Sequence, residues 1–290
     1  MEPFPQSNNA DELRKAGKYL EAIQMYEQMI KGSASSYPTR WLIYCLRKSG
    51  QVEDAFRIAQ ESLEKFPHDQ YIRSEMSWVI YDREIKPGRE SGEIGRVINA
   101  TQKALDLDPN NDFLVNIACQ AVMKTAKKAN NPDWKVVAEF AVKIEPTKLS
   151  TDKRKTSNGK FYLSEREDWY LNTSKAFLKA ENYQKAIDIA TSGLQDFPNE
   201  FYLIRTIALA QFYSGDPIAA AETMRPLLNH PKSSWYVKSE LAEIEMTLGN
   251  EEEAYRLFCQ SLYTRQDPQF KVKNLEIFVD LCLKLDKIEE

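Results

Sequence analysis

A short pattern recurs in this chain at a fixed spacing, and it constrains the fold more than any other feature. Each copy has a glycine, an alanine five residues later and another apolar residue nine residues later, as in "GNEEEAYRLFCQSL". The glycines of the four copies are Gly17, Gly50, Gly215 and Gly249. The first two are 33 residues apart and the last two are 34 apart. A period of this length indicates a repeat architecture, in which each unit buries its apolar face against its neighbours.

Prolines mark the ends of the repeats. Pro67, Pro109, Pro146 and Pro198 each follow one apolar run with helical spacing and precede another. Proline has no N–H and disfavours the helical conformation in the residue before it, so a helix should end there. Each repeat is therefore predicted to be a hairpin of two helices. Its first helix (the A helix) ends at a glycine that adopts positive φ, and its second (the B helix) ends before a proline.

The alanines of the pattern allow the register to be tested. An alanine five residues after the turn lets the B helix approach the A helix closely, so we expect Ala220 and Ala254 to be buried at helix contacts. The segment "EDWYLNTSKAFLKAENYQKAIDIATSGL" fits the same hairpin, with Ala186 and Ala190 in place and Glu181 where a glycine is expected.

These motifs resemble the tetratricopeptide repeat, whose unit is 34 residues and two antiparallel helices. The resemblance covers almost the whole chain. It implies an all-α fold, a right-handed α-solenoid of antiparallel helix hairpins. We expect residues 1–290 to form a single solenoid of roughly seven hairpins, with insertions at 82–93 and 147–165 that lie in surface loops.

The end of the chain continues the repeat. In "KLDKIEE", Asp286 aligns with Gly249, and the next residue should be the alanine of another B helix. We therefore expect residues 1–290 to be the N-terminal part of a longer protein, or to self-associate through this end. A regulatory repeat region of an enzyme, with its catalytic domain beyond residue 290, is one alternative function.

The sequence shows no constellation that carries chemistry. It has two histidines, His68 and His230, each beside a proline where a B helix should end, and its four cysteines are spread through apolar runs. It lacks the glycine-rich phosphate-binding motifs and the nucleophile elbow. We predict no catalytic residue, no cofactor and no metal, and thus a protein that is not an enzyme. No apolar run approaches the ~18–20 residues that span a bilayer, so we expect a cytoplasmic protein without a membrane partner.

The resemblance also implies where a partner would bind. In tetratricopeptide folds the A helices line the concave surface, and the register places a basic and aromatic set of side chains there. The predicted groove residues are Arg40, Tyr44, Arg47, Lys48, Trp78, Tyr81, Asn116, Gln120, Lys124, Lys175, Lys179, Arg205 and Tyr213. Acidic residues follow at its end, namely Glu240, Glu243, Glu276 and Asp280. This polarity suits an extended protein segment, and the first predicted function is a non-catalytic scaffold or adaptor for such a partner.

A nucleic-acid-associated adaptor is the other alternative. The insertion 147–165 carries Lys153, Arg154, Lys155 and Lys160 next to two aromatic residues, a combination that contacts phosphates and stacks on bases. The net charge of −4 does not favour this function. Segments such as "YCLRKSGQVEDA" and "SWYVKSELAEI" also resemble the N-terminal repeat region of proteins from prokaryotic conflict (TOTE-type) systems, which implies a prokaryotic adaptor beside nucleic-acid-processing enzymes.

Overall fold

The chain is built almost entirely from helices. A computed structural model describes residues 5–31, 35–153, 155, 159, 161–263 and 272–287. Within these residues the only β-type pairing is an isolated bridge between Lys155 and Phe161. By its internal contacts the chain divides into two compact units, Met1–Ile144 and Glu145–Glu290, and each is described by itself.

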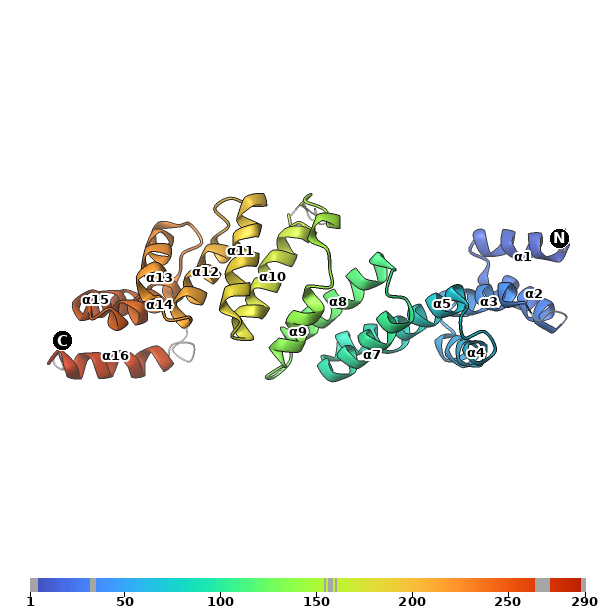
Figure 1. The fold of residues 1–290 in the computed structure, drawn as a ribbon, viewed down its shortest axis with the longest axis horizontal. Coiled ribbons are helices and arrows are strands. Elements are labelled where there is room, and N and C mark those ends of the chain that lie inside the picture. The colour runs from blue at the N-terminus through green and yellow to red at the C-terminus, as the bar shows by residue number, and fades with distance from the viewer. Residues whose placement is uncertain are drawn as a thin grey trace. The chain divides into compact units, whose positions relative to one another are not determined.

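Unit 1 consists of four successive helix pairs (Figure 1). Its helices are α1 (Pro5–Lys15), α2 (Tyr19–Lys31), α3 (Ser36–Lys48), α4 (Val52–Lys65), α5 (Gln70–Ile80), α6 (Lys86–Ser91), α7 (Ile94–Leu107), α8 (Asp112–Ala126) and α9 (Trp134–Ala141). A π-helical turn, η1 (Tyr81–Ile85), joins α5 to α6. The A helices are α1, α3, α5 and α8, and each packs against the B helix that follows it.

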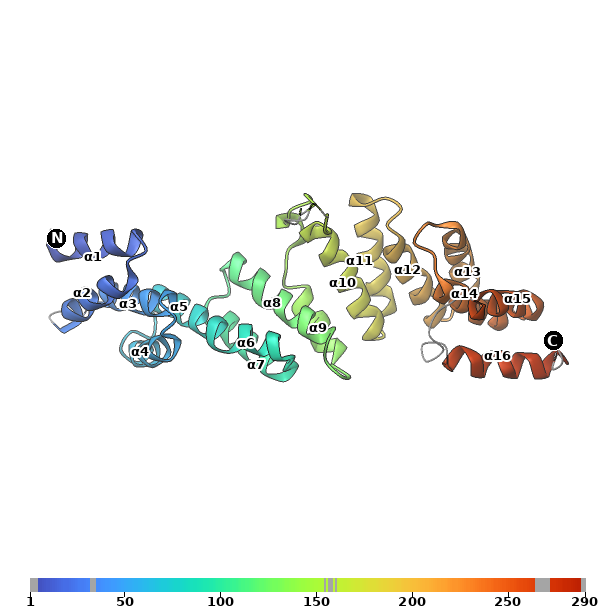
Figure 2. The same cartoon turned by 180° about the vertical axis from the view of Figure 1, so that it is seen from behind.

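Unit 2 consists of three helix pairs and a further helix (Figure 2). Its helices are α10 (Glu165–Lys179), α11 (Tyr183–Asp196), α12 (Phe201–Tyr213), α13 (Pro217–Met224), α14 (Trp235–Thr247), α15 (Glu251–Leu262) and α16 (Val272–Lys284), with 3-10 turns η2 (Pro146–Lys148) and η3 (Arg225–Asn229). The A helices α10, α12 and α14 alternate with B helices, and α16 packs on α15.

One hydrogen-bond pattern is shared by the turns that end α1, α3, α10, α12, α14 and α16. At Gly50 the N–H donates to the carbonyl of Arg47 (3.2 Å), and the next N–H, of Gln51, donates to the carbonyl of Leu46 (2.9 Å). These two bonds define the Schellman motif, which needs positive φ at its centre. The residues with positive φ at this position are Gly17, Gly50, Glu181, Gly215, Gly249 and Asp286. The predicted register is thereby confirmed, including the two positions without glycine.

The alanines of the repeat pattern are buried, as the register predicts. Ala220 and Ala254 are fully buried, and so are their counterparts Ala22, Ala55 and Ala186. The residues four positions further on are also buried, from Tyr26 in α2 to Phe258 in α15. Close packing of A and B helices around these alanines supplies the core of each unit.

Residues 82–93 do not form the surface loop that we predicted. They continue the A helix as η1 and α6, and Gly92 ends the extension with φ of 80°. The π turn within this extension has a local cause at Pro87, which has no N–H to give to the carbonyl of Arg83. The backbone widens into a π turn, in which Lys86 N–H donates to Tyr81 O. The carbonyl of Arg83 accepts instead from Nη2 of Arg96 in α7 (3.2 Å).

The described part of the second insertion, 147–165, has no helix or strand between η2 and α10. Its start is fixed to α10 by Arg166, whose Nη2 donates to the carbonyls of Thr147 (2.9 Å) and Leu149 (3.1 Å). The side chain of Leu149 is buried. Ser164 caps α10 by accepting from the N–H of Glu167 (3.1 Å). The segment is thus anchored at both of its ends.

The C-terminal prediction lies partly outside the described residues, because these stop at Lys287. Before that point, α16 buries Leu281 and leaves Leu275, Val279 and Leu283 exposed. Among the residues that the structure describes, no helix has the length and apolar character that a membrane span requires.

Candidate partner-binding surfaces

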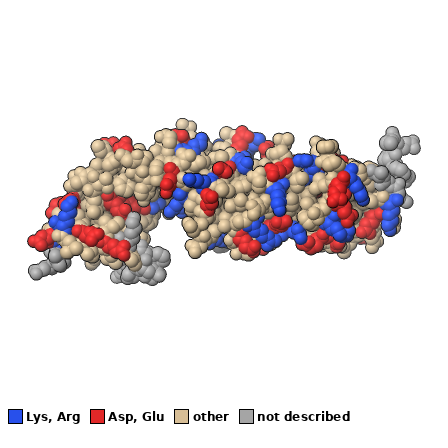
Figure 3. Space-filling model, turned by 60° about the horizontal axis from the view of Figure 1, so that its bottom comes forward, with Lys and Arg blue, Asp and Glu red and all other residues tan. Residues whose placement is uncertain are grey.

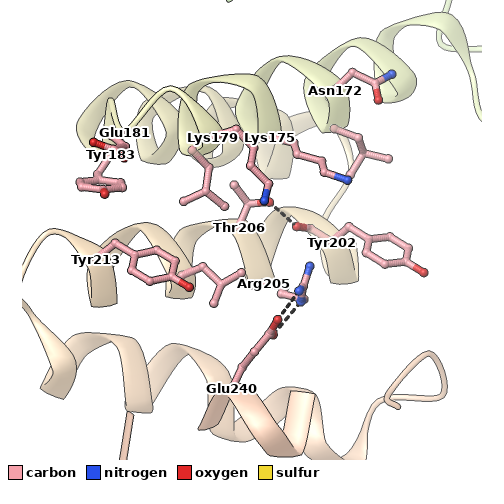
Figure 4. Close-up of a pocket in the computed structure, with 13 residues that line it drawn as sticks. Asn172, Lys175, Lys179, Glu181, Tyr183, Tyr202, Arg205, Thr206, Tyr213 and Glu240 are labelled. Atoms are coloured by element: carbon pink, nitrogen blue, oxygen red, sulfur yellow. Dashed lines mark hydrogen bonds and ion pairs between the residues drawn. The ribbon is translucent and has the colours of Figure 1, made fainter. Parts of the chain in front are cut away.

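An open pocket of about 790 Å³ lies along the A helices of unit 2 (Figure 4). The pocket lies between α10 and α12 and reaches α14 through Glu240. Its lining residues are Leu171, Asn172, Lys175, Leu178, Lys179, Glu181, Tyr183, Tyr202, Arg205, Thr206, Leu209, Tyr213 and Glu240. The predicted groove residues Lys175, Lys179, Arg205 and Tyr213 are therefore brought together here.

Aromatic and apolar side chains supply much of this pocket. Tyr183 of α11 and Tyr213 of α12 lie with their ring centroids 6.1 Å apart and their planes tilted by 31°. Leu178 and Leu209 line the pocket beside them. Tyr202 and Tyr213 are both about half exposed, at 44% and 52%. The pocket is therefore open to solvent, and a ligand can displace water from these two rings.

A charged pair closes the α14 side of the pocket. Nε of Arg205 donates to Oε2 of Glu240 (2.8 Å), and Nη2 donates to Oε1 of the same carboxylate. The guanidinium also lies 4.8 Å from the ring centroid of Tyr236. Burial alone would lower the pKa of Arg205, but the bond to Glu240 outweighs it and raises that pKa. Arg205 is therefore a fixed, fully charged donor rather than a free cation.

The A helices of unit 1 carry a cluster of stacked cations and rings. The guanidinium carbon of Arg14 in α1 lies 3.5 Å from the Trp41 ring centroid. Arg40 in α3 lies over Tyr71 (4.2 Å), Trp41 (4.7 Å) and Tyr37 (5.0 Å). Such contacts within about 6 Å are attractive because the ring face is negative. The sequence predicted Arg40 at this surface, and the structure adds the rings that hold it.

Arg47 lies at the same surface but is not free to bind a partner. Its side chain is only 7% exposed, and Nη1 lies 2.9 Å from Asp82 of η1 and Nη2 lies 3.8 Å from Glu75 of α5. Asp82 comes from the helical extension that we predicted to be a loop. Neither acid was recognised from the sequence, since the pairing spans 28 and 35 residues and depends on the α5–η1 geometry.

Glu75 has a half-buried side chain, 17% exposed, in an unusual environment. Burial raises its pKa to about 7, against the attraction of Arg47 and Arg40, which would lower it. Its Oε2 has no hydrogen-bond partner within the described part of the chain. Asp11 of α1 is the opposite case, because Tyr26 (2.5 Å) and Tyr37 both donate to it and lower its pKa despite partial burial.

The remaining predicted groove residues form local contacts. Trp78 packs against Tyr81 and Phe113, with ring centroids 5.9 and 5.8 Å apart. On α8, Gln120 donates to Asn116 (2.7 Å) and Lys124 donates to Gln120 (3.2 Å). Lys48 is exposed, with Nζ 5.6 Å from the Tyr44 ring. Glu276 and Asp280 are exposed on α16, and Glu243 is half-buried on α14.

The loop residues proposed for nucleic acid are only partly described. Lys153 and Lys155 are exposed, and Nζ of Lys155 lies 5.8 Å from the Phe161 ring, while Arg154 and Lys160 lie outside the described residues. The nucleic-acid function stays a prediction. On the face drawn in Figure 3, acidic and basic side chains are interspersed.

The structure gives no support to a metal or thiol centre in the residues that it describes. No group of three or more metal-binding side chains comes together there. The cysteines are free thiols, and burial raises the pKa of Cys45 and of Cys119 to about 12, which keeps these thiols protonated. The ring of His230 packs on Phe201 (4.9 Å) and its Nδ1 accepts from the N–H of Lys232 (3.0 Å).

Several solved structures are similar to this chain. A tetratricopeptide repeat protein from Parabacteroides merdae is 12% identical, with 94% of this chain and 97% of that chain covered and a TM-score of 0.42. The C-terminal part of a repeat protein from Cytophaga hutchinsonii is 15% identical over 92% and 98% of the two chains, with a TM-score of 0.46. YrrB, described as a repeat protein with an unusual peptide-binding site, is 12% identical over 79% and 98%, with a TM-score of 0.47.

No protein-family model matches the sequence, and no curated protein matches it. The assignment of the repeats rests on features of this chain itself, namely the period, the Schellman turns and the buried alanines. These features identify the fold as an all-α array of tetratricopeptide-type hairpins.

Proposed function

We propose that this protein is a non-catalytic interaction scaffold, and that the pocket between α10, α12 and α14 binds an extended segment of a partner protein. The pocket of about 790 Å³ is the observation that carries the proposal, since it lies on the A-helix face and collects four predicted groove residues. Tyrosine and arginine, which line it, are the residues most often found at binding hot spots.

The openness of the walls favours a peptide over a small molecule. Small-molecule sites bury most of their ligand, typically 70–90% of its surface. Here Tyr202, Tyr213, Lys175 and Lys179 are all exposed on the rim. An extended chain gains affinity from many shallow contacts along such a surface, so a polypeptide segment fits this geometry better.

The lining predicts the character of the segment. Leu171, Leu178 and Leu209 offer an apolar patch for one aliphatic or aromatic anchor. Glu181 and the lysines of α10 place both signs of charge around it, so polar groups on either side of the anchor can be paired. We therefore expect partner segments with a central apolar residue and flanking polar or charged residues.

A peptide-display selection against the full chain tests this function. Selected peptides should bind the wild type in fluorescence anisotropy, and Tyr213→Ala and Lys179→Glu should each weaken binding at least about tenfold. Lys185→Glu is the matched control, because Lys185 is exposed on the B helix α11; it should leave the affinity unchanged. Peptides that bind equally to Tyr213→Ala, Lys179→Glu and the wild type would exclude the pocket as their site.

A further inference from the structure

Three side chains of α3 form a row on one side of that helix in unit 1. Arg40, Tyr44 and Lys48 are spaced four residues apart, and residues at this spacing lie above one another on a helix. Nζ of Lys48 lies 5.6 Å from the Tyr44 ring. At 1.5 Å of rise per residue, the backbone positions of Arg40 and Lys48 are about 12 Å apart.

Arg40 is held in place by aromatic rings rather than by a direct ion pair, although Asp69 and Glu75 lie near enough to attract it. Its guanidinium lies within 4.2 to 5.0 Å of the ring centroids of Tyr71, Trp41 and Tyr37. Its Nε is buried and has no hydrogen-bond acceptor within the described ranges. No described carboxylate forms an ion pair with it, whereas such pairs are found for its neighbours. Arg14 lies 3.6 Å from Asp11, for example.

The contrast with Arg47 makes Arg40 the available cation. Arg47 is already paired with Asp82 and Glu75 and is almost fully buried. Arg40 is half-buried and Lys48 is exposed, so both can reach a partner's anion. A guanidinium fixed by stacked rings loses little freedom when it binds, which favours the planar, two-pronged contact that arginine makes with carboxylates.

We propose that this row is a recognition site for an acidic extended segment of a partner protein. One carboxylate meets Arg40, a second carboxylate four residues along the segment meets Lys48, and the side chain midway between them rests on Tyr44. The spacing follows from geometry. An extended chain rises about 3.3 Å per residue, so four residues span about 13 Å, close to the length of the row. Side chains at positions one, three and five also point to the same side of such a chain.

This inference concerns unit 1 and does not depend on the pocket of unit 2. The two sites differ in chemistry as well, because the row offers unpaired cations and the pocket offers tyrosines, leucines and a closed ion pair. Either site can fail its test while the other passes.

Synthetic peptides provide the direct test with the full chain. The probe is a fluorescein-labelled Gly-Ser-Glu-Ser-Leu-Ser-Glu-Ser-Gly, whose two glutamates are four residues apart. The first control replaces both glutamates with lysine. The second moves one glutamate next to the other and keeps the net charge. We expect saturable anisotropy with the probe, binding at least about fivefold weaker with the adjacent-glutamate peptide, and none with the lysine peptide.

Variants of the protein locate the binding. Arg40→Gln should weaken binding of the probe at least about tenfold. Lys48→Gln should weaken it about two- to fivefold, as expected for an exposed ion pair. Lys65→Gln removes the same charge from the exposed face of α4 and should have no effect. Arg40→Lys keeps the charge without the planar group and should fall between wild type and Arg40→Gln. Circular dichroism and a thermal melt establish that each variant is folded.

Three results would overturn the proposal. They are equal binding of all three peptides, equal weakening by Lys65→Gln and Arg40→Gln, and unchanged binding in a folded Arg40→Gln variant. A probe with phosphoserine in place of both glutamates separates the two sources of negative charge. If only the phosphoserine peptide binds, the proposed acidic segment of the partner is a phosphorylated one and not one with glutamate or aspartate.

Discussion

The two units build the same hairpins but treat the cations on their A helices differently. In unit 1, Arg40 is stacked among three aromatic rings and keeps its charge unpaired among the described residues. In unit 2, Arg205 makes a two-pronged ion pair with Glu240, and a pocket opens beside it. The A–B contacts fix only the buried face of each A helix. The other face is free to vary, so one scaffold can carry two recognition surfaces.

The two units also differ in how they satisfy the hydrogen bonds of a carboxylate that is shielded from solvent. Glu245 on α14 has both oxygens satisfied, because Arg225 donates to Oε1 (2.7 Å) and Asn250 donates to Oε2 (2.7 Å). Glu75 on α5 has one oxygen without a partner in the described residues. A buried charge stabilises a fold only when its hydrogen bonds are complete. We therefore expect the two acids to contribute very differently to stability.

The prediction with the largest effect concerns the buried alanines of the repeat, which both units share. Ala55→Leu in unit 1 and Ala220→Leu in unit 2 should each lower the free energy of unfolding by about 3 kcal/mol, because both alanines are fully buried between helices and leucine overpacks the contact. Urea denaturation followed by circular dichroism measures this. Ala16→Leu, at an exposed position, is the control and should be near neutral. A neutral result at both buried sites would mean that the register is wrong.

The next prediction compares how much Glu245 and Glu75 contribute to stability. Glu245→Ala should cost about 2 kcal/mol of unfolding free energy, since it removes three hydrogen bonds of a side chain that is 1% exposed. Glu75→Ala should cost less than about 1 kcal/mol, because Arg47 keeps Asp82 as a partner. Urea denaturation at pH 7.5 compares them. Equal costs would contradict the view that hydrogen-bond satisfaction distinguishes the two sites.

A smaller effect concerns the ion pair beside the pocket. Arg205→Lys keeps the charge but loses the two-pronged bond to Glu240 and the planar stacking on Tyr236. We expect a loss of about 1 kcal/mol, reduced by the partial exposure of both side chains. The same denaturation experiment measures it. Arg256→Lys is the control, because Arg256 makes the same two-pronged bond to Glu253 at an exposed position of α15. A loss no greater than that of the control would show that the Arg205–Glu240 pair adds no more stability than an exposed pair.

The last effect is a dependence of stability on pH. The pKa of Glu75 is about 7 in the folded protein against an ordinary value of 4.5, so between these values the folded state holds a proton that the unfolded state releases. Stability from this group is therefore full below pH 4.5, falls as the pH rises toward 7, and is constant above it. The Tm of Glu75→Gln minus that of the wild type should increase from pH 5 to 7.5 and then level off. A difference that does not change with pH would contradict the raised pKa.

The sequence predicted the features of the fold that repeat. Glycine at positive φ, buried alanine and terminal proline recur at most of the hairpins, and the repeated signal was strong enough to tolerate Glu181 and Asp286 in place of glycine. The prediction of a surface loop at 82–93 was wrong, because this segment is a helical extension. In the sequence, Pro87 predicts the end of a helix. The helix accommodates it through a π turn and through Arg96, which donates to the carbonyl of Arg83.

The surfaces were predicted less completely for a related reason. Register alone placed Arg40, Lys175, Arg205 and Tyr213 on the A-helix face, but it cannot show which cation is already paired. The pairing of Arg47 with Glu75 and Asp82 joins consecutive A helices and depends on side-chain direction. The difference between a stacked, unpaired Arg40 and a paired Arg205 therefore required the structure.

Hydrogen–deuterium exchange of the full chain with a display-selected peptide reports which helices a partner covers, and so locates the recognition surface. We expect slower exchange in α10, α12, α14 and the first turn of α11, which carries Tyr183, with no change in α13 or in the rest of α11. We also expect that the two-glutamate peptide slows exchange in α3 and in the first turn of α5 instead. Slower exchange confined to α11 and α13, or the same helices covered by both peptides, would contradict the claim that the two units present separate recognition surfaces on their A helices.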